Sequence, residues 1–168
     1  MPKDFKAVIA ALAIIVLGAA AYNYFAFADE RRVQRTLLDL REKVSAPITG
    51  GLDTVLTAAA LKPFFAPEVN ISFQHVGELR RTFDRDDLLR VITGIKQRNP
   101  EFTVKLDFSR RNIKIIEGRS AAVSALAAVE NLGEPFESRR LTFTFEKYEA
   151  RWRLTAVDED GARQGTEK

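Results

Sequence analysis

Two stretches decide the fold: IKIIEGRSAAVSALAAVE at residues 113–130 and RRLTFTFEKYEARWRLTAV at residues 139–157. In the second stretch, Leu141, Phe143 and Phe145 alternate with polar residues, which is the period of a strand with one buried face. Turn signals at residues 117–119 and 149–150 separate the strands. Residues 120–130 are small and apolar, and alanine by itself favours a helix. Their place between two turns predicts instead a strand that is covered on both faces.

Helical patterns come before these strands. Apolar residues at helical spacing predict an amphipathic helix over about residues 30–45, a shorter one that stops near Lys62-Pro63, and a third that Thr82 or Asp84 caps and Asn99-Pro100 ends. The apolar stripe of the first helix is Val33, Leu37, Leu40 and Val44. That of the second is Leu52, Val55, Leu56 and Ala59, and that of the third is Leu88, Val91, Ile92 and Ile95.

Alternation also predicts strands at residues 69–73, 104–108 and 113–115, and a last one around Trp152, Leu154 and Ala156. Helices that are segregated from a run of hairpins indicate an α+β domain. We therefore expect a strongly bent, cone-like antiparallel sheet packed against three helices. The domain is expected over residues 29–158, followed by a polar tail at residues 159–168.

Residues 7–28 carry no charged side chain. As a helix they would reach about 33 Å, enough for a bilayer core of ~30 Å. Aromatic residues gather at the far end, where they favour the membrane interface. The sequence thus predicts one transmembrane helix within an N-terminal anchor, residues 1–28, which contacts lipid through residues 7–28.

Two questions about this segment stay open. Ala26-Phe27-Ala28 has the small-x-small pattern of a signal-peptidase site, although the charge-free stretch is long for a signal peptide. The basic residues after the span favour a cytoplasmic domain, whereas the short lysine-bearing tail favours the opposite orientation. We expect a single-pass protein of a bacterial inner membrane with a periplasmic domain.

Composition excludes several classes of site. The chain of 168 residues has no cysteine and one histidine, His75. This composition excludes disulfides, thiolate metal sites and paired histidine ligands. We expect no metal and no cofactor. The net charge is +3, and the arginine doublets have acidic residues close by. This pattern is typical of solvated faces, so we expect no nucleic-acid partner.

The order of elements and several local motifs resemble the nuclear-transport-factor-two-like superfamily, which includes SnoaL-like cyclases and ketosteroid isomerases. The matching motifs are FAPEV at residues 65–69, Val76-Gly77, IIEGRSAAV at 115–123, TFTFEK at 142–147 and RWRLTAV at 151–157. The resemblance covers about residues 30–158 and implies the cone-shaped fold. It implies no single activity, because members include enzymes, carriers and assembly modules.

Enzymes of this superfamily place an acidic base just before a Val-Gly pair such as Val76-Gly77. Here the equivalent residues are Gln74 and His75, and the domain's only tyrosine is Tyr148 on the last hairpin. These departures argue against isomerase chemistry, and we predict no catalytic residue. If the chain is an enzyme after all, His75 is the candidate general base.

Two sets of residues are candidates for binding. The residues expected to line a pocket inside the cone are Phe73, His75, Phe108, Phe143 and Trp152. If no helix covers the outer face of residues 120–130, this face forms a flat apolar surface for a partner, made of Ala122, Ser124, Leu126 and Ala128.

The favoured function is a membrane-tethered, non-catalytic binding or assembly module, an accessory or scaffold subunit of a larger membrane complex. Scaffold subunits of type IV secretion systems have a similar architecture. Its protein partner would be another subunit or a second copy. The alternative is an isomerase-like or cyclase-like enzyme, or an apolar-ligand carrier, that uses the cone pocket.

Overall fold

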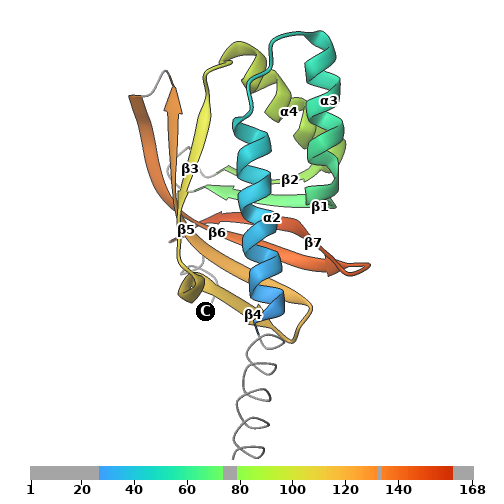
Figure 1. The fold of residues 1–168 in the computed structure, drawn as a ribbon, viewed down its shortest axis with the longest axis vertical. Helices are drawn as coiled ribbons and strands as arrows, with labels where there is room; N and C mark the ends of the chain where they lie inside the picture. Colours follow the sequence, from blue (N-terminus) through green and yellow to red (C-terminus); the bar gives the residue numbers. More distant parts are fainter. Residues whose placement is uncertain (1–26, 74–78, 132–133, 161–168) are drawn as a thin grey trace, which may run out of the picture.

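A computed structural model describes residues 27–73, 79–131 and 134–160 of the chain. Helices come first and strands dominate the second half (Figure 1). The helices are α2 (Ala28–Ser45), α3 (Gly51–Leu61) and α4 (Arg85–Arg98), with short 3-10 helices η1 (Lys62–Phe64) and η2 (Arg110–Asn112). The strands are β1 (Phe65–Phe73), β2 (Leu79–Asp84), β3 (Thr103–Asp107), β4 (Ile113–Ile116), β5 (Ser120–Asn131), β6 (Glu134–Tyr148) and β7 (Arg151–Glu159).

The strands form one mixed sheet in the order β2-β1-β7-β6-β5-β3, and β4 pairs with the first half of β5. All pairs are antiparallel except β1 with β7, which is parallel. The α+β class is confirmed, whereas the expectation of a purely antiparallel sheet is wrong. Alternation reports which face is buried but not the direction of the neighbouring strand, so the pattern could not reveal this pair.

The core lies between α2 and the sheet, which curves around this helix (Figure 1). Val33, Leu37 and Leu40 of α2 are buried and join one apolar cluster with side chains of β1, β5, β6 and β7. Phe145 and Trp152 contribute the largest aromatic surfaces to it. The predicted stripe of this first helix is thus confirmed.

Strand β5 shows how tertiary context overrides the helix preference of alanine. Ala121, Val123, Ala125 and Ala127 face the core and are buried, while the residues between them are half-buried or exposed. The prediction of a strand is confirmed, but the expected cover on both faces is wrong. The small inward side chains leave space between this part of the sheet and α2.

Two strand boundaries differ from the pattern. β1 begins at Phe65, before Pro67, and its pairing with β7 shifts register between Phe65 and Asn70, where proline offers no N–H to the ladder. The alternation pattern misses β2, because Arg80 and Arg81 mask it. Charged residues are expected on such a strand at the edge of a sheet.

The apolar stripe of helix α3 faces away from the core, whereas its sequence pattern predicts that this stripe is buried. Leu52, Val55 and Leu56 of the predicted inward stripe are 73%, 65% and 58% exposed, and Ala59 is exposed as well. Thr54 lies on the side of α4, where its hydroxyl accepts a hydrogen bond from Gln97 Nε2 at 2.8 Å. The prediction of a helix is confirmed, but the predicted orientation is wrong.

Helix α4 is capped as expected, since Asp84 accepts a hydrogen bond from the Asp86 amide at 2.8 Å. Its buried face is rotated from the predicted stripe: Val91 and Ile95 are exposed, whereas Thr93 and Lys96 are buried. Lys96 is only 1% exposed, and its ammonium donates to the main-chain oxygens of Ser45 and Phe102 at 3.1 and 2.8 Å. It therefore ties the end of α2 to the start of β3.

The predicted span, residues 7–28, lies outside the described residues except for Phe27 and Ala28, which begin α2. None of the helices in the described ranges combines the length and hydropathy needed to cross a bilayer. At the other end, the predicted tail boundary is too early. Glu159 is buried in β7, and the Asp160 amide donates to Arg140 O at 3.0 Å.

We expect Lys96→Met to lower the free energy of unfolding by about 2–4 kcal/mol, because two buried main-chain oxygens lose a charged donor. Denaturant unfolding of the full chain in mild detergent, followed by the fluorescence of the single buried tryptophan, Trp152, measures this loss. Lys43→Met, at an exposed position in the last turn of α2, should cost less than about 0.5 kcal/mol.

The pH dependence separates this role from simple packing. Burial lowers the pKa of Lys96 from its ordinary 10.5. The unfolded state therefore holds this proton to a higher pH than the folded state, and wild-type stability rises with pH in that interval. The stability gap between wild type and Lys96→Met should widen as the pH rises toward 10.5; a gap that narrows would contradict the assignment.

Candidate functional site

An apolar cavity of about 280 Å³ lies between α2 and the sheet. Its walls come from α2, α4 and strands β1, β3, β5, β6 and β7. Every described lining residue is apolar except Arg41. Ala127 is one of the small inward residues of β5, so the alanine-rich sequence of this strand helps to leave the space unfilled. Such a cavity suits an apolar ligand.

Arg41 is the one charged residue in the described lining, and it lines the cavity with the aliphatic part of its side chain, because no polar atom is exposed there. It lies on α2 beside Leu37, Leu40 and Val44, at the spacing of the apolar stripe, and it is half-buried. Among the described residues, no hydrogen bond or ion pair reaches its side chain. The guanidinium itself is not exposed in the cavity, so within the described residues the cavity surface is entirely apolar.

A cluster of charged residues borders the cavity at β6. A neighbouring hollow shares Phe73, Ala127 and Leu141 with the cavity and adds Glu137 and Arg139. The Arg139 guanidinium donates to Glu137 and, at 2.8 Å, to Glu159 Oε1. The hydrogen bond to Glu137 is the main reason why the pKa of Arg139 is raised. Both carboxylates thus accept hydrogen bonds from the same guanidinium.

The described lining offers little acid–base chemistry. A general base needs a pKa near the working pH and a place within hydrogen-bond reach of the substrate. Apart from Arg41, the described lining consists of hydrocarbon side chains, which cannot exchange a proton. No group of three or more His, Asp or Glu residues suited to a metal ion is found in the described ranges.

The structure separates the five predicted pocket residues. Phe73 and Phe143 line the apolar cavity. His75 lies outside the described residues. Phe108 packs against the core but borders a different hollow, next to Ser124 and Leu126 on the outer side of the sheet.

Trp152 is a core residue, and its assignment to the cone pocket is wrong. The indole is 4% exposed and belongs to the main apolar cluster. The residue borders a second hollow of about 320 Å³ between α2 and the turn that follows β6. The Lys147 ammonium lies 5.5 Å from the ring centroid, a cation–π contact. Strand alternation places Trp152 inward but cannot say which part of the interior it reaches.

The predicted partner surface lies on the outer face of β5. Ala122, Ser124 and Ala128 are half-buried and Leu126 is exposed, alternating with the buried residues of the same strand. The Ser124 and Thr142 hydroxyls lie 3.2 Å apart across the β5–β6 pair, so a polar contact interrupts the apolar face.

Sequence reasoning missed two features that the structure brings out. One is Arg41, although a signal existed, because a charged residue at stripe spacing between Leu37 and Val44 is unusual for a core helix. The other is the outward stripe of α3 (Leu52, Val55, Leu56). No signal in the sequence marks it, since periodicity identifies an apolar face but not what covers it.

No family model and no curated protein matches the sequence. Solved structures do match. One is a protein of unknown function from Shewanella oneidensis MR-1, with a TM-score of 0.58 and 14% identity, covering 79% of this chain and 97% of that chain. The fold is NTF2-like. It is the nuclear-transport-factor-two-like fold that the sequence motifs led us to expect.

Other similar structures differ in the roles attributed to them. A proposed dehydratase of the NTF2-like family from Streptomyces avermitilis has a TM-score of 0.55 and 14% identity, covering 79% of this chain and 94% of that chain. The yeast UBP3-associated protein BRE5 has a TM-score of 0.55 and 13% identity, covering 76% of this chain and 92% of that chain. At this level of identity the likeness shows the fold alone.

We expect Ala127→Phe to block the cavity, because the added ring occupies the apolar space in front of β5. The affinity for an apolar fluorescent dye that binds such cavities should fall about tenfold or more, a loss of at least ~1.4 kcal/mol. Ala122→Phe is the matched control, since it adds the same ring to the outer face of the same strand. Equal dye binding by the two variants would show that the dye does not use the cavity.

Proposed function

We propose that this chain is a membrane-tethered, non-catalytic binding and assembly module, an accessory or scaffold subunit of a larger membrane complex. The observation that carries the proposal is the outward apolar stripe of α3, formed by Leu52, Val55 and Leu56. Large apolar side chains that are exposed together on one helix face are typical of a partner surface. The partner is a protein subunit or a second copy of the chain.

Polar contacts support the outward orientation of this stripe. At the start of α3, Asp53 accepts hydrogen bonds from the amide and hydroxyl of Thr49, and these hold the pKa of its carboxyl below the ordinary value. Thr54 contacts Gln97 of α4, and Lys62 just beyond the helix pairs with Asp86 at 3.1 Å. A rotation that buried the stripe would break contacts at both ends of the helix.

Covering the stripe is energetically useful. Complete burial of a leucine or valine side chain stabilises an interface by about 1.5–3 kcal/mol, and these three are more than half exposed. The charge-free segment at residues 7–28 supports the tether, which confines the domain near a partner in the same membrane and raises its effective concentration. The proposed location is a bacterial inner membrane, with the domain on the periplasmic side.

A photo-crosslinking residue in place of Val55 tests this assembly role in the full chain within native membranes. We expect a defined protein adduct, whose mass distinguishes a second copy from another subunit. The same probe at Glu68, an exposed position on β1, should give none. Leu52→Lys together with Leu56→Lys should abolish the Val55 adduct with little change in stability. An adduct that persists in this variant would contradict the role of the stripe.

A second function, that of a carrier for apolar ligands, is favoured by the cavity with Arg41. The lining suits a hydrocarbon chain. We further propose that a carboxylate or phosphate at the end of such a chain would reach beyond the apolar surface to the guanidinium of Arg41. The catalytic alternative rests on His75, which lies outside the described residues, and it stays a prediction from the sequence.

We expect the delipidated chain to bind a fluorescent fatty acid and Arg41→Met to weaken this binding about tenfold to a hundredfold, the range for a lost charged hydrogen bond. An uncharged fatty alcohol should bind both forms alike. Arg35→Met, an exposed position one and a half turns earlier on α2, is the control. Equal fatty-acid binding by wild type and Arg41→Met would exclude Arg41 as the anion partner.

A further inference from the structure

We propose that one end of the domain rests on anionic phospholipid headgroups. We call this surface the basic rim; it consists of residues 27–32 at the start of α2 and residues 110–119 in η2, β4 and the following turn. The inference rests on the proposed membrane tether and adds the part of the domain that faces the lipid and the lipid charge that it prefers.

The two parts of the rim lie together in space. Figure 1 shows β4 beside the first turns of α2, at the end of the molecule away from α3 and α4. The Arg110 guanidinium lies 5.9 Å from the centroid of the Phe27 ring. The charge-free segment ends at residue 28, directly after Phe27. A bilayer that holds this segment would therefore lie close to the rim.

The rim concentrates the positive charge of the chain. It contains six basic and three acidic residues, a surplus equal to the +3 of the whole sequence. Arg110, Arg111, Lys114 and Arg119 are all exposed. Within the described part of the chain, no ion pair reaches Arg111, Lys114 or Arg119. Unpaired surface cations next to a bilayer are attracted to anionic headgroups within a Debye length, about 8–10 Å.

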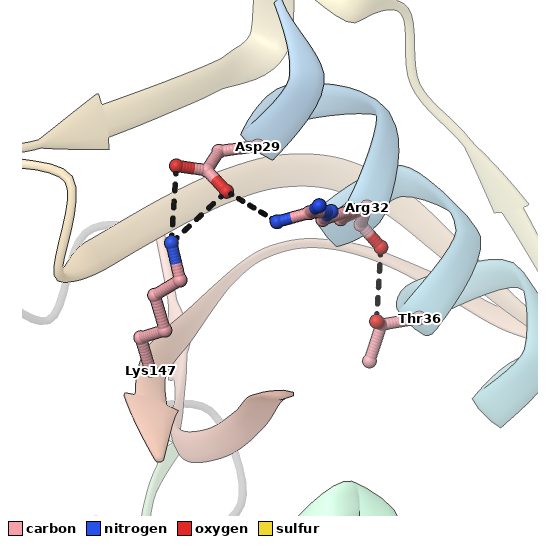
Figure 2. Close-up of polar contacts among 4 residues, drawn as sticks. All are labelled: Asp29, Arg32, Thr36 and Lys147. Carbon is pink, nitrogen blue, oxygen red and sulfur yellow. Dashed lines mark hydrogen bonds and ion pairs between the residues drawn. The ribbon is translucent and has the colours of Figure 1, made fainter. Parts of the chain in front are cut away.

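One of the three acidic residues is already neutralised. Figure 2 shows Asp29 between Lys147, at 3.2 Å, and Arg32, at 3.6 Å. Lys147 comes from β6, so this ion pair also holds the start of α2 against the sheet. Glu30 and Glu117 are the acidic residues that remain in the rim, against four exposed basic residues in residues 110–119 alone.

Exposed apolar side chains are interspersed with these cations. Ile116 is 52% exposed and Phe27 is 37% exposed. Ile116 leads into the turn that Arg119 closes, with the Arg119 amide donating to Ile116 O at 3.1 Å. Apolar side chains among basic residues suit the headgroup region, where hydrocarbon and charge are both within reach. A merely solvated basic face would gain nothing from exposing isoleucine and phenylalanine.

The absence of cysteine from the chain allows a direct test. The variant Ile116→Cys carries a fluorophore on its introduced thiol, and the full chain is reconstituted into vesicles that contain a headgroup-attached quencher. We expect several-fold more quenching with phosphatidylglycerol than with phosphatidylcholine alone, and less at 0.5 M salt by ionic screening. The same fluorophore on Val55→Cys, in α3, should show little quenching in either lipid.

Charge neutralisation supplies the matched comparison. Arg111→Gln, Lys114→Gln and Arg119→Gln together should abolish the extra quenching of the fluorophore at position 116 in phosphatidylglycerol. Arg81→Gln, Arg90→Gln and Arg98→Gln remove the same charge from exposed positions of β2 and α4 and should leave it unchanged. Trp152 fluorescence reports whether each variant remains folded.

Flotation after a carbonate wash separates the two proposals. A chain that does not float with the vesicles has no membrane tether, which would overturn both the tether and the basic rim. A chain that floats but shows equal quenching of the position-116 fluorophore in the two lipids would overturn the rim alone. Quenching that survives the three rim substitutions would overturn it as well.

Discussion

The packing of α2 against the concave face of the sheet is the contact on which the other features depend. Val33 and Leu37 of this helix have almost no exposed surface, and the sheet curves around the helix (Figure 1). The same helix brings Arg41 to the cavity, carries the basic rim at its first turn and reaches Lys96 through Ser45 at its last. If α2 were displaced, the cavity would lose a wall and the rim would lose its alignment with β4.

The sequence was sufficient for the class of the domain and most of its elements, because their signals are local. Asp84, Asn99 and the turn at residues 117–119 end or begin elements through their own backbone chemistry. What the pattern could not supply depends on distant residues. The parallel pairing of β1 with β7 requires knowledge of which strands meet, and the outward stripe of α3 requires knowledge of what lies beside it.

The residues of the candidate site also fall into two groups, those that local sequence patterns predict and those that depend on distant parts of the chain. Strand alternation directs Phe73 and Phe143 toward the interior of the domain, and their positions on β1 and β6 bring them to the cavity. Trp152 follows the same alternation, but it belongs to the packed apolar cluster and does not line this cavity. The sequence does not predict that Arg41 lines the cavity, because a charged residue on a helix is usually solvated. The walls of the cavity come from seven elements, and no single stretch of sequence contains that information.

The apolar cavity and the exposed surfaces have different chemical character. The cavity suits an apolar ligand, whereas α3 and the basic rim present exposed surfaces on different parts of the domain. A protein partner on α3 would leave the rim free. Ligand binding, partner binding and lipid contact are therefore compatible with one another in a single orientation.

Helix α2 contains neither glycine nor proline between residues 28 and 45, so no hinge interrupts it. It behaves as a stiff rod about 27 Å long, at 1.5 Å per residue. A force applied at residue 27 would be transmitted along this helix to the wall of the cavity. It would also reach Ser45 at the far end, whose main-chain oxygen accepts the hydrogen bond from Lys96. A displacement at residue 27 would therefore not be absorbed by a glycine or proline hinge within α2.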